Sequence, residues 1–196
     1  MAIFFTSDTH FSHNRIIELC NRPFKSVSHM NEALIAKWNS VVSPTDTVYH
    51  LGDVALGSLD TWDGALSRLN GHKVLVIGNH DRLFRENKPA YVERFKGVYS
   101  QWFDSTEDNI TNLVLSDGTN VNLSHFPYTG DSHDKPRYND FRLADDGTVL
   151  LHGHTHADTC VSRSASGTLQ VHVGVDAWDY TPVAEWQIIK TIKEAG

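Results

Sequence analysis

Several features are scarce in this chain of 196 residues, and each scarcity narrows what the protein can be. No apolar run approaches the ~18 residues of a membrane-spanning helix. The start of the chain turns polar after Phe5, too early for a signal peptide. The two cysteines, Cys20 and Cys160, are far apart and form no metal-type pair. These absences predict a cytoplasmic protein that works in a reducing compartment and has no membrane partner.

Basic residues are also scarce, since 17 Lys and Arg face 24 Asp and Glu, for a formal net charge of −7. This balance argues against an extended nucleic-acid surface. It permits a small anionic substrate if bound metal ions supply positive charge. No repeat or linker interrupts the chain, so we expect a single domain over residues 1–196, of unspecified oligomeric state.

The first half of the chain alternates between strand and helix patterns. A run of apolar residues predicts each strand, and apolar residues at helical spacing predict each helix. The expected strands span residues 2–7, 46–51 and 73–77, and the expected helices span residues 15–19, with Ser12 as N-cap, 28–42 and 59–69. This order predicts right-handed βαβ units and a parallel sheet.

The second half is dominated by strands. The expected elements are a hairpin of 113–115 with 121–123, a strand at 148–151, a hairpin of 159–163 with 169–175, and an edge strand at 184–189. Together the halves predict an α/β protein with two mixed β-sheets packed face to face and helices outside.

Twelve histidines are the most unusual feature of what is present, and their placement is not random. Five polar clusters follow predicted strands: Asp8/His10, Asp53, Asn79/His80/Asp81, His125 and His154/His156. Ligands of open α/β sheets bind at the carboxyl ends of strands, so we expect these clusters to converge. Alternate residues of an extended chain point to one side, so each Asp-x-His or His-x-His pair is expected to face one centre.

The chemistry of the clusters indicates a metal site. Carboxylate, amide and imidazole without thiolate suit Mn, Fe, Zn or Ni better than a closed structural zinc site. The candidate ligands are Asp8, His10, Asp53, Asn79, His125, His154 and His156. That number suits two ions that share one carboxylate, and ions ~3.5–4 Å apart can clamp a phosphoryl group for in-line displacement.

Five motifs follow one another over residues 8–156: Asp8-x-His10, Gly52-Asp53, Gly78-Asn79-His80-Asp81, His125 and Gly153-His154-x-His156. In this order they resemble the motifs of the calcineurin-like metallophosphoesterases, particularly those of small single-domain bacterial and phage members. The resemblance implies a four-layer αββα sandwich with a dinuclear site at the strand ends. It also assigns Asp8, His10 and His156 to one metal and Asn79, His125 and His154 to the other, with Asp53 bridging. We expect two divalent ions, with manganese favoured.

The resemblance also implies catalytic roles. His80 would contact the phosphoryl group and protonate the leaving oxygen, with Asp81 orienting it, while a hydroxide bridging the metals attacks phosphorus. Candidate substrate contacts are His13, Arg22 and Arg137, although a surface or capping histidine is the slightly better interpretation of His13.

The remaining histidines receive simpler interpretations. His172 and Asp176 end a late strand and are candidates for hydrogen bonds to ligand histidines. We expect His29, His72 and His133 to lie on the surface, and His50 and His152 to face away from the metals.

The predicted activity is hydrolysis of phosphoesters. The chain has little length to spare for a cap, which favours a phosphodiesterase acting on small substrates such as 2′,3′-cyclic nucleotides. The alternative is a phosphomonoesterase acting on phosphoproteins or nucleotides. A nuclease and a non-catalytic scaffold are further alternatives, disfavoured by the acidic charge and by the complete ligand set respectively.

Overall fold

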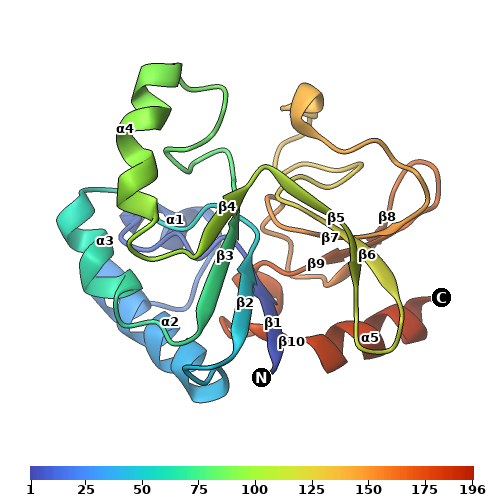
Figure 1. Ribbon diagram of the computed structural model, residues 1–196, viewed down its shortest axis with the longest axis horizontal. Coiled ribbons are helices and arrows are strands. Elements are labelled where there is room, and N and C mark those ends of the chain that lie inside the picture. Colours follow the sequence, from blue (N-terminus) through green and yellow to red (C-terminus); the bar gives the residue numbers. More distant parts are fainter.

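The computed structural model describes residues 1–196 and contains two β-sheets. The first sheet consists of β1 (Ile3–Thr6), β2 (Thr47–His50), β3 (His72–Val76), β4 (Ser105–Glu107) and β10 (Val183–Ala184). The second consists of β5 (Asn109–Val114), β6 (Asn120–Ser124), β7 (Val149–His152), β8 (Val161–Arg163) and β9 (Leu169–His172). The two sheets pack against each other, and the carboxyl ends of their parallel strands lie toward the same side of the molecule (Figure 1).

Both sheets are mixed, as the sequence predicts. The first has the order β10-β1-β2-β3-β4, in which β1 to β4 run parallel and β10 is antiparallel. The second has the order β5-β6-β7-β9-β8, in which β6, β7 and β9 run parallel between antiparallel β5 and β8. Parallel strands place their carboxyl ends at one edge, and this edge carries the polar clusters.

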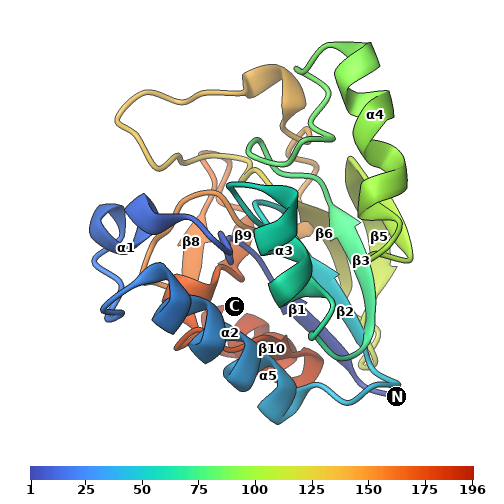
Figure 2. The ribbon, with the colours of Figure 1, turned by 90° about the vertical axis from the view of Figure 1, so that its left-hand side faces the viewer.

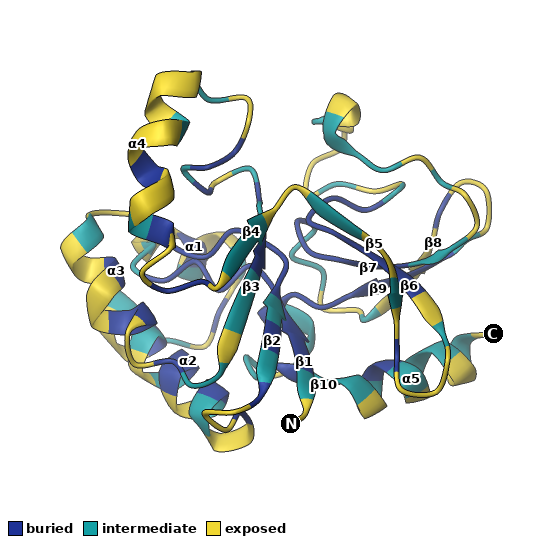
Figure 3. Ribbon diagram, viewed as in Figure 1, coloured by how far each residue is buried: buried dark blue, intermediate teal, exposed yellow.

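Four helices flank the first sheet: α1 (Asn14–Leu19), α2 (Val27–Val41), α3 (Leu59–Leu66) and α4 (Pro89–Tyr99). Figure 2 shows α2 and α3 in front of β1 and β2. The Ser26 hydroxyl caps α2 by accepting a hydrogen bond from the His29 amide at 3.2 Å. The inward face of α2 buries Met30, Leu34 and Trp38, while outward faces of the helices are exposed (Figure 3).

Alternation along the strands builds two separate cores. Phe4 and Leu75 face the helices and join Trp38 in one core. Phe5 and its counterparts on the second sheet, such as Leu151, form the other core between the sheets. The core between the sheets fixes their relative position, and with it the position of the strand ends.

The face of the second sheet that points away from the first is covered by the segment after β6. The Asn122 amide donates to Tyr128 Oη at 3.0 Å, and the Gln170 amide donates to the Thr129 carbonyl at 3.0 Å. These contacts anchor the start of the segment, and it then reaches the carboxyl ends of the strands, where Asp131 lies near His154.

The structure corrects two predicted elements and adds others. The edge strand predicted at 184–189 is wrong: only Val183–Ala184 pairs with β1, and helix α5 (Glu185–Ala195) follows. Gln187 accepts a hydrogen bond from the Ala184 amide at 3.0 Å and starts this helix, and Ile188 packs into the core between the sheets. Ser12 is not the N-cap of α1; its φ is +64°, and His13 takes that position without a side-chain bond.

Helix α4 and strand β4 were not predicted at all.

No helix of the structure combines the length and apolarity needed to cross a membrane.

Candidate active site

The five polar clusters meet at the carboxyl ends of strands from both sheets. Residues after β1, β2 and β3 supply Asp8, His10, Asp53 and Asn79, and residues after β6 and β7 supply His125, His154 and His156. Most of these side chains form the floor of a cleft of about 490 Å³. The predicted convergence is therefore present, although the two halves of the site come from different sheets.

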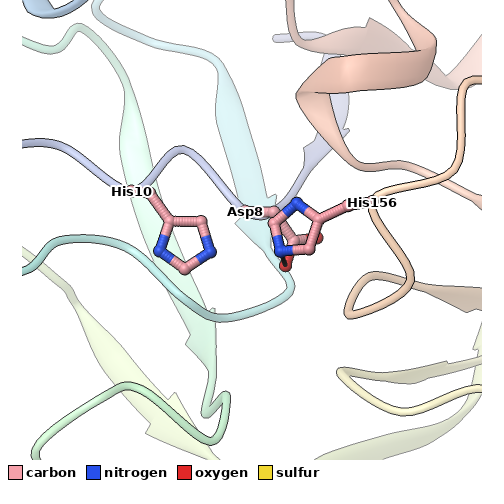
Figure 4. A group of neighbouring side chains, drawn as sticks. All are labelled: Asp8, His10 and His156. Carbon is pink, nitrogen blue, oxygen red and sulfur yellow. Dashed lines mark ion pairs between the residues drawn. The ribbon is translucent and has the colours of Figure 1, made fainter. Parts of the chain in front are cut away.

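One group of ligand atoms joins the first and second halves of the chain. Atoms of Asp8, His10 and His156 all lie within 4.8 Å of one another. Figure 4 shows the rings of His10 and His156 beside the Asp8 carboxylate. Both nitrogens of His10 are buried without a hydrogen-bond partner, which is costly unless an ion occupies the space between these groups.

A second group of donor atoms surrounds the amide oxygen of Asn79. Asn79 Oδ1 lies 3.0 Å from His125 Nε2 and 2.9 Å from His154 Nδ1. The other nitrogen of His125 lies 2.7 Å from the Leu51 carbonyl, which fixes the ring with Nε2 facing Asn79. An oxygen and two imidazole nitrogens are thus brought together from three separate segments.

Asp53 lies between the two groups. Its Oδ2 is 3.6 Å from His10 Nε2 and also 3.6 Å from His125 Nε2. Its other oxygen accepts the His80 backbone amide at 2.8 Å. One carboxylate oxygen therefore has equal access to both sets of donors.

The electrostatics of the site match a pair of cations. Burial raises the pKa of the Asp8 and Asp53 carboxyls, since two anions lie out of water without enough positive charge beside them. Burial lowers the pKa of His10 well below its usual value, and that of His154 to about 2. Neutral imidazoles such as these, beside carboxylates, are donors for a divalent transition metal. Burial lowers the pKa of His156, but the hydrogen bond with Asp176 and the other acidic groups nearby raise it by more, to about 11, so an ion would replace a proton on that ring.

The backbone of the site is strained. Five of the seven candidate ligands have left-handed backbone conformations: Asp8 (φ 56°), His10 (48°), Asp53 (57°), His154 (70°) and His156 (52°). Each such residue costs of order 1–3 kcal/mol and is common at functional sites. The idea that strand alternation aims each pair is therefore wrong, because β1 and β7 end before the ligands and turns direct them instead.

The prediction that Arg22 contacts a substrate phosphate is wrong. Arg22 is buried, and its donors are occupied by Asp176 at 2.8 and 2.9 Å and by the carbonyls of Asp8 and Thr9 at 2.7 and 3.1 Å. Asp176 in turn lies 3.1 Å from His156 Nδ1, the contact expected from the sequence. Arg22 therefore holds the turn that carries Asp8 and supports the carboxylate that orients His156.

Asp81 also differs from its predicted role. Its carboxylate accepts the backbone amides of Gly78, Asp53 and Val54 at 2.7, 3.0 and 3.1 Å, so it does not orient His80. Burial and the neighbouring Asp53 raise the pKa of Asp81 to about 6. Asp81 ties the turn after β2 to the turn after β3.

His80, His13 and Arg137 line the cleft beside the ligand groups. The rings of His80 and His13 lie 5.5 and 5.4 Å from the ring of His10. His133, expected on the surface, is exposed and also lines the cleft.

The other histidines differ in burial and in their contacts. His29 and His72 are exposed, and His50 and His152 are buried outside the donor groups. His172 forms no bond to a ligand histidine; its ring packs 5.4 Å from that of His152.

Two neighbours of the site carried no signal in the sequence. Asp131 lies 3.3 Å from His154 Nε2, and Cys20 is grouped with His156 and Asp176. A single aspartate in a polar loop and a lone cysteine have no spacing that marks them, so only the fold reveals them.

Comparisons with known proteins agree with this arrangement. The calcineurin-like phosphoesterase family profile matches residues 1–158. The Gene 66 protein of Mycobacterium phage L5 is 40% identical over 183 residues, which cover 89% of this chain and 86% of that protein. An uncharacterized protein of Methanocaldococcus jannaschii is 32% identical over 196 residues, 98% of this chain and 92% of its own length.

A solved structure is also similar. The crystal structure of a protein of unknown function from Aquifex aeolicus superimposes with a TM-score of 0.72 at 28% identity, covering 97% of this chain and 98% of the other. The protein is a metal-dependent phosphoesterase. It has two mixed sheets with flanking helices, a cleft whose floor carries histidines and carboxylates, and the sequence profile of that class. The chain belongs to the calcineurin-like phosphoesterases, whose members depend on two metal ions.

Proposed function

We propose that the protein hydrolyses small phosphodiesters, with 2′,3′-cyclic nucleotides as the favoured substrates. The observation that carries this proposal is the position of Asp53 Oδ2, equidistant from the two donor groups at the floor of one small cleft. A shared carboxylate between two donor groups is the arrangement that holds a pair of ions for displacement at phosphorus.

The two donor groups fit divalent cations. Asp8, His10 and His156 would hold one ion, Asn79, His125 and His154 the other, and Asp53 both. Manganese suits this mixture of carboxylate, amide and imidazole. When bound, the ions supply polarisation of the phosphoryl oxygens and a water acidic enough to act as nucleophile near neutral pH.

We infer that His80 donates a proton to the leaving group. The His80 ring is exposed to the cleft beside His10, and its backbone amide is held by Asp53 at 2.8 Å. A proton passed from the imidazolium to the leaving oxygen as the P–O bond breaks would let that group depart as a neutral alcohol and leave the imidazole neutral. His13 and Arg137 offer further donors to the phosphoryl oxygens from the same cleft.

The lining of the cleft supports a small diester. Its volume of about 490 Å³ lies in the range of ligand pockets. Helix α1 and the residue after it contribute an apolar part of the lining, namely Ile16, Leu19 and Cys20, and Leu19 is 63% exposed. An exposed leucine beside an ionic floor suits the flat, apolar part of an organic substituent. The free cysteines suit a reducing compartment, and we infer a cytoplasmic location.

The test is a hydrolysis panel in which metal-stripped protein is reloaded with Mn²⁺. We expect bis-p-nitrophenyl phosphate to be cleaved faster than p-nitrophenyl phosphate, and 2′,3′-cyclic nucleotides faster than 3′,5′-cyclic nucleotides. Faster cleavage of the monoester would support the phosphomonoesterase alternative instead. Asn79→Ala and His125→Ala should lose bound metal and activity together, whereas His72→Ala, at the far end of β3, should lose neither.

A second test isolates His80. His80→Ala should retain both metals by elemental analysis and lose about 10²–10⁴-fold in kcat, most for alkyl leaving groups. Full activity toward alkyl esters in the metal-loaded variant would contradict the proton-donor role.

A further inference from the structure

The segment after β6 sends one carboxylate into the site that none of the motifs contains. Asp131 has a side chain that is 1% exposed, although residues on either side of it in the loop are exposed. Asp131 Oδ1 lies 3.3 Å from Nε2 of His154, which is ion-pair distance, and this buried nitrogen has no hydrogen-bond partner in the protein. The other nitrogen of that ring, Nδ1, faces Asn79 Oδ1 at 2.9 Å. We propose that Asp131 is a positioning residue that orients His154 and connects it to Arg137 in the cleft.

The chemistry of imidazole gives this contact its meaning. A neutral histidine that binds a metal through one nitrogen carries its proton on the other. A carboxylate close to Nε2 favours the tautomer with its proton on that nitrogen, which leaves the lone pair of Nδ1 directed at Asn79. His156 is arranged in the opposite sense, since Asp176 lies 3.1 Å from Nδ1 and leaves Nε2 facing Asp8. Each donor group thus contains one histidine held by a carboxylate.

Two arginines hold the Asp131 carboxylate in place. Arg137 donates to Oδ1 from Nη2 at 2.9 Å and from Nε at 3.2 Å, and its backbone amide donates to Oδ2 at 2.9 Å. Arg142 donates to Oδ2 from Nη2 at 3.0 Å and also bonds the Pro127 and Gly130 carbonyls at 2.8 Å. Burial raises the pKa of Asp131, but the hydrogen bonds from Arg137 lower it by more. The pKa is therefore below its ordinary value, and the carboxylate stays ionised.

This network has two consequences. Asp131 joins a member of the Asn79–His125–His154 group to Arg137, whose side chain is 38% exposed and lines the cleft. Removing its charge should therefore weaken metal binding by that group and release Arg137 at the same time. The other donor group has its own carboxylate, Asp176, and should be unaffected.

The inference rests on the proposed dimetal function, and its test needs no turnover. Mn²⁺ is titrated calorimetrically into metal-free wild-type protein and into Asp131→Asn, a nearly isosteric change. We expect one of the two sites to weaken about 10–100-fold and the other to keep its affinity. Asp134→Asn, an exposed aspartate of the same segment, is the matched control and should leave both affinities unchanged.

Two further measurements separate orientation from mere packing. Arg142→Gln loosens the segment but keeps the Asp131 carboxylate, so it should weaken metal binding less than Asp131→Asn. Histidine ring ¹⁵N NMR should show neutral His154 with its proton on Nε2 in the wild type and a mixture of the Nδ1-H and Nε2-H tautomers in Asp131→Asn. The metal-loaded Asp131→Asn variant should also have a raised KM, because Arg137 is released.

The outcomes distinguish this inference from the proposed function. Unchanged Mn²⁺ affinity in Asp131→Asn with an active wild type overturns the role of Asp131 alone. Equal losses in Asp131→Asn and Arg142→Gln also overturn it, since packing of the segment would then be the cause. A wild type that binds two ions without hydrolysing any ester overturns the function, while a weakened site in Asp131→Asn still supports the positioning role.

Discussion

At the scale of single residues, Gly78 decides how closely two strand ends approach. A Cβ atom at this position would lie 2.5 Å from the Asp53 amide nitrogen, would contact Asp53 Oδ1, and would lie 2.9 Å from His125 Nδ1. Gly52 faces it with φ +89° and an equally close approach. The pair of glycines allows the shared carboxylate to sit between donors from both sheets.

Gly78→Ala should therefore damage the site through backbone displacement. We expect a loss of about 1–3 kcal/mol in the free energy of unfolding, measured in urea, because the added methyl has no space. Mn²⁺ affinity should fall with it, since Asp53 must move. Gly97→Ala is the control: it lies in helix α4 with nothing within 4 Å of the added atom and should be neutral or stabilising. Equal stability of the two variants would contradict the packing argument.

At the scale of elements, the sequence predicts which segments carry the site but not how they carry it. The apolar runs and the polar residues after them place Asp8, Asp53 and Asn79 at strand ends, because buried parallel strands have a recognisable pattern. The turns that direct these residues depend on left-handed backbone conformations, which no local pattern of aspartate and histidine announces.

Two of the wrong predictions concern roles that depend on distant partners. Arg22 bonds Asp176, 154 residues away in the chain, and Asp81 bonds the amide of Asp53, 28 residues away. An arginine near a phosphate site and an aspartate after a histidine fit several roles equally well. The supporting roles of Arg22 and Asp81 follow only from the packing of α1 and the turns against one another, because that packing brings each side chain to its distant partner.

Arg22 provides a test at this scale. Arg22→Met removes one partner of a buried pair and leaves two carbonyls without donors, so we expect a loss of about 3–5 kcal/mol in the free energy of unfolding. Arg68→Met is the matched control, because Arg68 makes a bidentate pair with Glu32 at 2.6 and 2.8 Å in which both side chains are exposed. It should cost about 1 kcal/mol or less. A raised KM with an unchanged free energy of unfolding in Arg22→Met would contradict the supporting role and would favour the interpretation of Arg22 as a phosphate contact.

At the scale of the whole molecule, the site exists only when the two sheets are packed together. The first sheet delivers Asp8, His10, Asp53 and Asn79, and the second delivers His125, His154 and His156. The core between the sheets, which includes Phe5 and Leu151, therefore sets the spacing of the donor groups. Metal binding and sheet packing should stabilise each other, because the unfolded chain has no preformed site.

The same packing buries histidines outside the donor groups, and these make the fold sensitive to acid. His50 packs against Trp38 with ring centroids 6.4 Å apart and approaches Thr9 Oγ1 at 2.9 Å, while its Nδ1 has no partner. Burial lowers the pKa of His50 to about 3. The ring is therefore neutral in the folded protein under conditions in which the unfolded chain, with a histidine pKa of about 6.5, is already protonated.

The sign of the effect follows from this difference. The unfolded state binds the extra proton first, so the free energy of unfolding is highest above pH 6.5 and falls as the pH decreases toward 3. One such histidine contributes about 1.4 kcal/mol per pH unit over this window. In urea unfolding of the metal-free protein, wild type should lose about 2–3 kcal/mol more than His50→Gln between pH 6.5 and 4.5. His29→Gln, which changes an exposed histidine, should follow the wild-type curve. Parallel curves for wild type and His50→Gln would mean that His50 takes up its proton inside the folded core, and that the acid sensitivity of the molecule arises elsewhere.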